Sequence, residues 1–263
     1  MALTAHMSPL EVRRAFRENR EARPTAGLCP GFVQCNLIIL PSSEADDFRA
    51  FAARNPMACP VLEETAPGVC GLIHLAQDAD VATDFPRYRV YRHGILEGEP
   101  LDIAALWRDD LVAFLIGCSF SFEEALLEAG LPVRYIEEGR NVPMYLTDID
   151  CAPAGIFGGK MVVSMRPMLP AQAEEAAAIT ARMPRVHGGP VHIGDGRAIG
   201  IRDVSRPDFG EAVTVREGEV CIFWPCGVTP QSAVMTAKPP LAITHAPGHM
   251  LVCDVRNSTL MDS

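Results

Sequence analysis

The 263-residue sequence lacks several features that would assign it to a large functional class. It contains no apolar run near the 18 residues that a membrane-spanning helix needs, and residues 8–20 form a charged helix signal rather than a secretory stretch. A net charge of −10 argues against nucleic acid and anionic membranes as partners, but it is compatible with a local arginine site for a small anionic substrate. We therefore expect a cytoplasmic protein without nucleic-acid or membrane partners.

The short motifs that bind phosphates and metals are absent as well. No glycine-rich loop has Walker or Rossmann spacing, and none of the nine cysteines belongs to a C-x-x-C pair. Because the number of cysteines is odd and the chain is long, a disulfide framework is not expected. We expect neither a metal ion nor an organic cofactor.

What is present is a globular composition, with 48% hydrophobic and 21% charged residues. Periodicity and turn residues predict a mixed α/β fold. Helices are expected at 8–20, 42–51, 103–107, 121–129 and 170–183, and strands at 32–40, 71–75, 88–91, 161–165, 190–193, 198–201, 241–244 and 249–255.

The apolar run 112–117 leads at once into a small polar turn and a helix signal. The turn carries Cys118 and Ser119, and Ser121 with Glu124 has the spacing of an S-x-x-E capping box. A helix N-terminus directs N–H groups and partial positive charge at whatever lies above it. The pattern predicts an anion-binding turn, and an ordinary strand–helix junction with a buried cysteine stays open as the alternative.

A second stretch repeats this plan. The apolar run 220–224 leads into Cys226 and Gly227, and Thr229 is expected to cap a helix with Pro230 at its first position. We expect the Cys118 turn and the Cys226 turn to lie side by side at the carboxyl ends of their strands, as sites in α/β proteins do.

Four histidines and one arginine are candidates to complete this site. His245 and His249 flank a loop whose Pro247 and Gly248 exclude a helical zinc motif, so proton transfer or substrate binding is the better interpretation, with a structural role open for one of them. Arg166 has the fork geometry to hold a carboxylate, and a surface ion pair is its alternative. The candidate catalytic residues are Cys118, Ser119, Ser121, Cys226, His245 and His249, and the candidate substrate-binding residues are Arg166, His187, His192, Gly227, Thr229 and Gln231.

Taken together, the motifs resemble those of the D-glutamate cyclase family, whose bacterial members are described as hydro-lyases. The matching segments are 84–91, 115–123, 141–145, 151–155, 163–167, 191–195, 207–210, 224–231 and 243–249. The resemblance implies a lyase that removes water, with closure of D-glutamate to 5-oxo-D-proline as the best-defined reaction. It also implies an α/β sandwich, which we place at about 1–140 plus 210–263, with a smaller inserted two-layer αβ subdomain at about 141–209.

This chemistry suits the candidate residues. Helix N-terminal amides after Cys118 and Cys226 would stabilise a tetrahedral oxyanion, His245 would move protons, and Arg166 would orient the α-carboxylate. Two other classes remain open: a non-catalytic binder of small carboxylic acids, and an acyl-transfer or amidohydrolase enzyme with Cys118 as nucleophile. The sequence is also compatible with a homo-oligomer.

Overall fold

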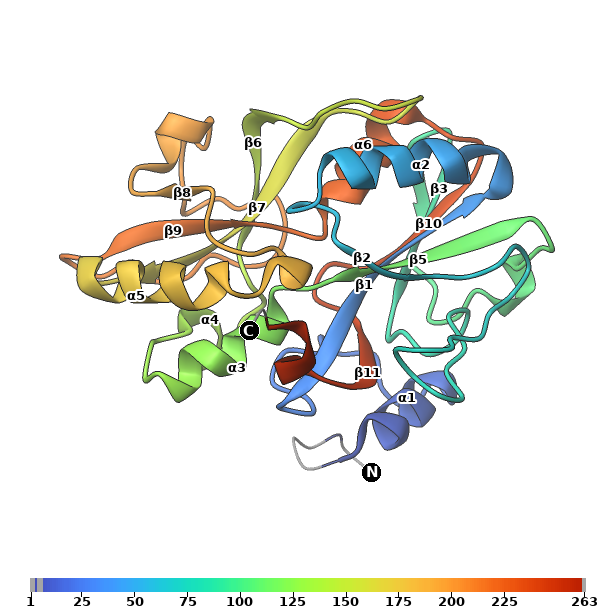
Figure 1. Ribbon diagram of the computed structural model, residues 1–263, viewed down its shortest axis with the longest axis horizontal. Helices are drawn as coiled ribbons and strands as arrows, with labels where there is room; N and C mark the ends of the chain where they lie inside the picture. The colour runs from blue at the N-terminus through green and yellow to red at the C-terminus, as the bar shows by residue number, and fades with distance from the viewer. Residues whose placement is uncertain (1–2, 4–6, 262–263) are drawn as a thin grey trace.

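The computed structural model describes residues 3 and 7–261, and its two sheets and their helices confirm the mixed α/β fold. The two antiparallel sheets lie beside each other along the long axis of the molecule (Figure 1). One hydrophobic cluster contains buried residues of both sheets, among them Leu37, Leu115, Met165 and Trp224, so the sheets are packed into one unit.

The seven-stranded sheet contains β1 (Phe32–Pro41), β2 (Val61–Glu64), β3 (Tyr88–Arg92), β4 (Ile95–Gly98), β5 (Leu111–Gly117), β10 (Ala242–His245) and β11 (Leu251–Arg256). Its order is β2-β5-β1-β10-β3-β4, and β11 also pairs with β1. The four-stranded sheet has the order β6-β7-β9-β8 and contains β6 (Met144–Asp150), β7 (Lys160–Met168), β8 (His192–Ile193) and β9 (Val220–Pro225).

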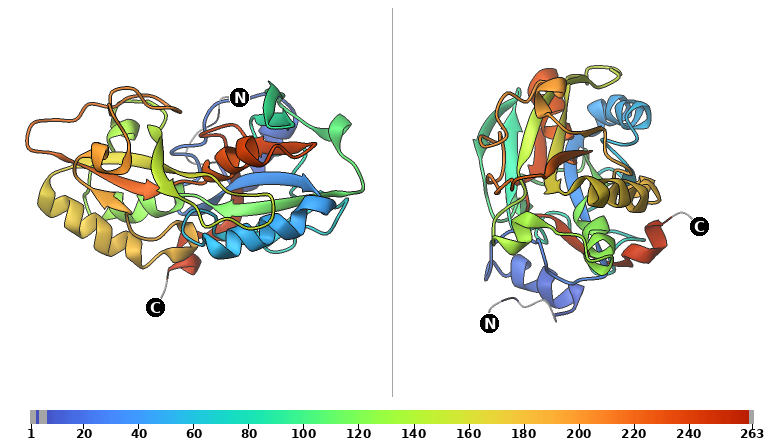
Figure 2. Two further views of the ribbon diagram at one scale, coloured as in Figure 1. Left: turned by 90° about the horizontal axis from the view of Figure 1, so that it is seen from above. Right: turned by 90° about the vertical axis from the view of Figure 1, so that its left-hand side faces the viewer.

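The helices are α1 (Pro9–Arg17), α2 (Ser42–Arg54), α3 (Phe120–Glu128), α4 (Arg134–Glu137), α5 (Pro170–Ala181) and α6 (Thr229–Ala237). Four 3-10 turns accompany them, η1 (Ala104–Leu106), η2 (Pro184–Val186), η3 (Gly196–Ile199) and η4 (Asn257–Leu260). Figure 2 shows α2 and α5 along the same side of the molecule. None of the helices in the described part of the chain is both long and apolar enough to cross a bilayer.

Strand β1 is the centre of the larger sheet and has an unusual pairing. Residues 35–41 pair with β5 on one side, whereas two strands share the other side. There β11 pairs with residues 32–35 and β10 with residues 38–39. Asn36 and Leu37 therefore lie where the two partner strands separate and the loop 246–250 connects them.

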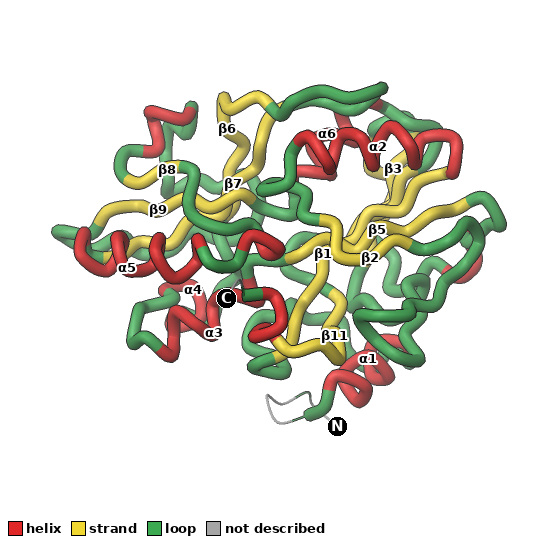
Figure 3. The backbone as a smooth tube through the Cα atoms, viewed as in Figure 1, coloured by secondary structure: helices red, strands yellow, loops and turns green. Residues whose placement is uncertain are grey.

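Most of the predicted elements are confirmed, often to within two residues, and α1 begins with a Ser8–Glu11 capping box in which both hydrogen bonds are present. The predicted strand at 71–75 is wrong. Segment 65–87 contains turns and isolated bridges but no strand (Figure 3), and the Glu63 carboxylate accepts the N–H groups of residues 73–75. The predicted strand at 198–201 is also wrong, because Asp195 caps the 3-10 turn η3 there.

Strand β9 bears on the expected division of the chain. It pairs with β7 from Val220 to Pro225 and so belongs to the four-stranded sheet, although the division at residue 210 grouped it with the larger part. The boundaries of the two subdomains remain a prediction.

Candidate active site

The two cysteine turns meet at Asn36 of β1. Its Nδ2 donates a hydrogen bond to the Gly117 carbonyl oxygen at 2.7 Å. A Cβ atom at Gly227 would lie 1.9 Å from the same Nδ2, so only glycine permits this approach. The structure thus brings the Cys118 turn and the Cys226 turn together at the point where β10 and β11 separate.

Both thiols are buried at the start of a helix. The amide of Phe120 lies against the Cys118 thiol and the amide of Val228 lies against the Cys226 thiol. Burial nevertheless dominates and raises the pKa of both thiols, to about 11 for Cys226 and well above the ordinary value for Cys118. Both groups are therefore protonated at neutral pH.

The two predicted caps are wrong. Helix α3 begins at Phe120, so Ser121 lies inside the helix, and its Oγ accepts the Gln34 N–H of β1 at 3.0 Å. Helix α6 begins at Thr229, whose Oγ1 donates back to the Cys226 carbonyl oxygen at 2.7 Å. Neither hydroxyl caps its helix, because Ser121 bonds to β1 and Thr229 bonds to the backbone of its own turn.

Arg166 lies within β7 and has no exposed side-chain surface. It donates hydrogen bonds to Ser164 Oγ at 3.0 Å, to Ser119 Oγ at 3.1 Å and to the Glu123 carboxylate. The Tyr135 hydroxyl donates to the same carboxylate. The guanidinium is thus engaged with protein groups and holds the Cys118 turn against the four-stranded sheet.

Gln231, in the first turn of α6, connects three elements. Its Nε2 donates to the His245 carbonyl oxygen at 2.9 Å. Its Oε1 accepts from the Tyr91 hydroxyl and from Arg89 Nη1, each at 3.3 Å. These bonds hold the start of α6 against β3 and β10.

His245 ends β10 and is buried. The Leu37 amide donates to its Nδ1 at 3.1 Å, and the Leu37 carbonyl oxygen lies farther from the same nitrogen, at 3.4 Å. We assign the ring proton to Nε2 because the shorter contact makes Nδ1 the acceptor. That Nε2 is buried and has no hydrogen-bond partner among residues 3 and 7–261. Burial lowers the pKa of His245 to about 3, so the ring is neutral and keeps a free N–H.

His187 lies beside the other turn. A Cβ atom at Gly117 would meet the Arg185 carbonyl oxygen at 2.0 Å, so the segment before His187 packs directly on the Cys118 turn. The His187 backbone has a φ of 85°, its Nδ1 lies 2.7 Å from the Met57 carbonyl oxygen, and its Nε2 is buried without a partner in the described residues. Burial lowers its pKa to about 4.

The other two candidate histidines, His192 and His249, contact carbonyl groups close to them in the sequence. His249 Nδ1 lies 2.9 Å from the Pro247 carbonyl oxygen, and burial lowers its pKa. His192 lies on β8, the outer strand of the four-stranded sheet (Figure 1). Its ring stacks on Phe223, and its Nε2 lies 2.9 Å from the Asp195 carbonyl oxygen. These contacts keep His192 with its own turn rather than with the cysteine turns.

Sequence reasoning missed four residues of this centre, namely Asn36, Arg89, Tyr91 and Glu123. Asn36 carried a usable signal, because an amide in the middle of an apolar strand demands a partner. Arg89 and Tyr91 lie in a segment that the sequence predicts as a strand and that resembles the family, but neither side chain was given a role. Within the described residues, no cluster of three or more histidine, cysteine or carboxylate side chains has the arrangement of a metal site.

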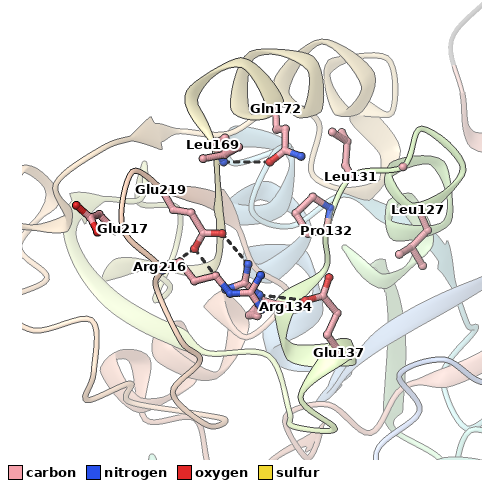
Figure 4. Close-up of a pocket in the computed structure, with 11 residues that line it drawn as sticks. Leu127, Leu131, Pro132, Arg134, Glu137, Leu169, Gln172, Arg216, Glu217 and Glu219 are labelled. Carbon is pink, nitrogen blue, oxygen red and sulfur yellow. Dashed lines mark hydrogen bonds and ion pairs between the residues drawn. The ribbon is translucent and has the colours of Figure 1, made fainter.

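A surface pocket of about 520 Å³ lies elsewhere, between α3, α4 and the start of α5 (Figure 4). Its buried Arg134 is bonded to Glu219 at 2.6 Å and to Glu137 at 3.1 Å. None of the candidate site residues lines it. The pocket is therefore separate from the centre formed by the cysteine turns.

Comparison with known proteins identifies the class to which this protein belongs. The family model described as D-glutamate cyclase matches residues 112–254, a range that includes both cysteine turns, Arg166, Gln231 and His245. This chain belongs to the D-glutamate cyclase family.

Its relatives match along nearly their whole length. Proteins named "Putative hydro-lyase" are 60% identical in Bordetella pertussis, over 99% of this chain and 92% of theirs, and 58% identical in Clostridium beijerinckii, over 95% and 96%. One from Bacillus subtilis is 56% identical, over 97% of this chain and 99% of its own. A nitrogen repressor-like protein of Methanococcus jannaschii aligns with a TM-score of 0.39 at 10% identity, over 97% of this chain and 98% of that one, which is too distant to support a conclusion.

Proposed function

We propose that this protein is a hydro-lyase that closes D-glutamate to 5-oxo-D-proline with loss of water. Membership of the D-glutamate cyclase family supports the reaction class. The observation that carries the proposal is the neutral His245, whose buried Nε2–H has no partner in the described chain. A buried donor left unpaired costs about 1–3 kcal/mol, and an oxygen of a bound substrate would satisfy it.

The reaction needs no added reagent. The substrate amine attacks the γ-carboxyl carbon, a C–N bond forms, and one C–O bond breaks. The protons that the ammonium group loses leave with that oxygen as water, so atoms and charge balance within the substrate. The site must therefore move protons and stabilise the tetrahedral oxyanion.

His245 is the group that we assign to the leaving oxygen. A neutral imidazole donates a hydrogen bond without first taking up a proton, as buried catalytic histidines with lowered pKa values do. The Leu37 amide fixes its tautomer, and the Gln231 side chain fixes its backbone carbonyl. Both contacts favour a rigid donor, which is what transition-state stabilisation requires.

Cysteine chemistry is not needed in this scheme. The raised pKa values of Cys118 and Cys226 disfavour thiolates at neutral pH, and the substrate supplies its own nucleophile. The acyl-transfer alternative thus has no support from the surroundings of either thiol. In our proposal the two turns contribute backbone amides and shape.

The test is incubation of the purified protein with D-glutamate and with L-glutamate, followed by chromatographic measurement of 5-oxoproline. We expect product from the D-enantiomer. Formation of no 5-oxoproline, together with no hydrolysis of 5-oxo-D-proline, would overturn the proposed reaction.

The role of His245 is tested by His245→Gln against His74→Gln, a matched change at an exposed histidine of segment 65–87. We expect kcat to fall by roughly 10²–10³-fold in the first variant, the range for removal of a preorganised donor, and to stay unchanged in the second. A folded His245→Gln protein with the parent's kcat and pH profile would remove His245 from the mechanism.

A further inference from the structure

Two arginines near the proposed site differ in what they offer to a ligand. The Arg166 side chain is 0% exposed and bonded to Glu123, whereas the Arg89 side chain is 21% exposed. An arginine that binds a small anion must be accessible, and some of its N–H groups must be available to donate hydrogen bonds to the anion. Arg89 meets the first condition and Arg166 does not.

Arg89 is also held in place without being saturated. Its Nε donates to Glu99 at 2.6 Å, and its Nη1 reaches Gln231 only at 3.3 Å. A carboxylate that approaches the outer edge of the guanidinium would replace this long contact with a short charge-assisted one. Glu99 would stay on the Nε side and keep the fork oriented.

A second arginine reinforces this position. Arg87 precedes β3, and its carbonyl oxygen accepts the Ala246 N–H at 2.9 Å, which continues the pairing with the β10 side of the sheet. Residues two apart on extended backbone point to the same face, so Arg87 and Arg89 lie on one side of the strand. The two guanidinium groups carry two positive charges, whereas Glu99 supplies one negative charge. The site is therefore positive, although the whole chain has a net charge of −10.

The arginines are close enough to the histidines to act on them. After burial, Arg89 is among the causes that lower the pKa of His245, and Arg87 is among those that lower the pKa of His249. The same Gln231 side chain contacts Arg89 and the His245 carbonyl oxygen. Gln231 therefore connects Arg89 directly to the end of β10.

We infer that Arg89, assisted by Arg87, binds one carboxylate of a small dicarboxylic or amino-dicarboxylic ligand. The inference rests on the proposed function for its second half: Arg89 holds the α-carboxylate of the substrate, and the γ-carboxyl reacts near His245. Arg166 then serves to position the Cys118 turn and does not contact the ligand.

The test uses glutarate, which has both carboxylates but no amine and cannot cyclise, with binding measured by calorimetry. Arg89→Gln is expected to weaken glutarate binding by about 10-fold or more, since it removes a charge-assisted pair, and Arg89→Lys to recover part of the loss. Arg92→Gln is the matched control, because Arg92 lies on the same strand, pairs with Glu97 and is 43% exposed. It should bind glutarate like the parent.

Turnover of D-glutamate gives the second readout. Arg89→Gln should raise KM by about 10-fold or more while kcat changes little, as expected when binding common to ground and transition states is lost. Parent-like glutarate binding or parent-like KM in a folded Arg89→Gln protein would overturn the inference while leaving the reaction intact. Glutarate binding that depends on Arg89, without any 5-oxoproline, would support the carboxylate site and refute the reaction. A parent protein that binds no glutarate and turns over no D-glutamate would overturn both.

Discussion

The two cysteine turns share one sequence plan but are held by different chemistry. The Cys118 turn is fixed by a buried ion pair, Arg166 with Glu123, whose guanidinium also bonds Ser119. The Cys226 turn is fixed by uncharged side chains of α6. Thr229 bonds to the backbone of its own turn, and Gln231 bonds to the backbone of β10 and to side chains of β3. The first network is closed from solvent, and the second leads to a partly exposed arginine.

This difference suggests a structural role for the Cys118 turn and a chemical role for the Cys226 turn. A buried charge pair must keep its geometry, because either partner alone is an uncompensated charge. Neutral amide contacts are easier to exchange for contacts with a ligand, since each contributes only about 1 kcal/mol. We therefore regard the α3 side as the rigid support and the α6 side as the reacting face.

The largest expected effect concerns the ion pair. Glu123→Ala leaves Arg166 buried and unpaired, so the free energy of unfolding should fall by about 3–5 kcal/mol. The double variant Glu123→Leu with Arg166→Met should recover most of this loss. Urea denaturation measures the free energy of unfolding of both variants. A loss below about 1 kcal/mol in the single variant would contradict the stabilising role of this ion pair.

The next effect concerns the contact between the turns. In Gly227→Ala the new Cβ would lie 1.9 Å from Asn36 Nδ2, and the stability should drop by roughly 1–3 kcal/mol, as overpacking does. Gly98→Ala is the control, because no atom lies within 4 Å of its new Cβ. Adding Asn36→Ala should relieve part of the cost. If thermal unfolding shows the same melting temperature for both glycine variants, the turns do not touch as described.

The free energy of unfolding at acid pH depends on the two buried histidines, His187 on the α3 side and His245 on the α6 side. The unfolded chain takes up protons at both below about pH 6.5, whereas the folded chain does so only near pH 4 and pH 3. Stability is therefore full above that window and falls as the pH drops through it, by about 1.4 kcal/mol per pH unit for each ring. His187→Gln and His245→Gln should each remove one such slope in urea titrations between pH 6 and 4.5. Slopes identical to the parent's would mean that the rings are not buried as neutral groups.

The smallest effect is expected at the thiols themselves. Cys118→Ser and Cys226→Ser should each change kcat/KM by less than about 10-fold, because neither thiol is activated as a nucleophile. Steady-state kinetics on folded variants measures this. Complete inactivity of Cys118→Ser alone would favour an acyl-enzyme and would reverse the assignment of scaffold and reacting face.

Local patterns anticipated much of this molecule. The strand before each cysteine and the helix after it are encoded within a few neighbouring residues. The fold class follows from the same signals. The two predicted caps are wrong because the Ser121 hydroxyl accepts the Gln34 N–H and the Thr229 hydroxyl accepts the Val162 N–H. Local spacing does not reveal these contacts with distant strands.

The contacts that decide roles are long-range. Arg166 and Glu123 are 43 residues apart, and Arg89 and Gln231 are 142 apart, so no sequence window contains either pair. A sequence can suggest that an arginine is available for a substrate, but only the packing determines whether a buried carboxylate already occupies it. The burial of Arg166 and the exposure of Arg89 are properties of that packing.

The divided edge of β1 has a consequence for how the chain is made. Strand β1 ends at residue 41, but β10 and β11, which cover its second edge, lie at residues 242–256. At the ribosomal pace of about 5–20 residues per second, that edge waits roughly 10–40 s for its partners. During synthesis a ten-residue, mostly apolar strand is therefore unpaired on one side, the situation in which strands associate with other chains. Strands β10 and β11 are thus the part of the chain that covers this edge of β1.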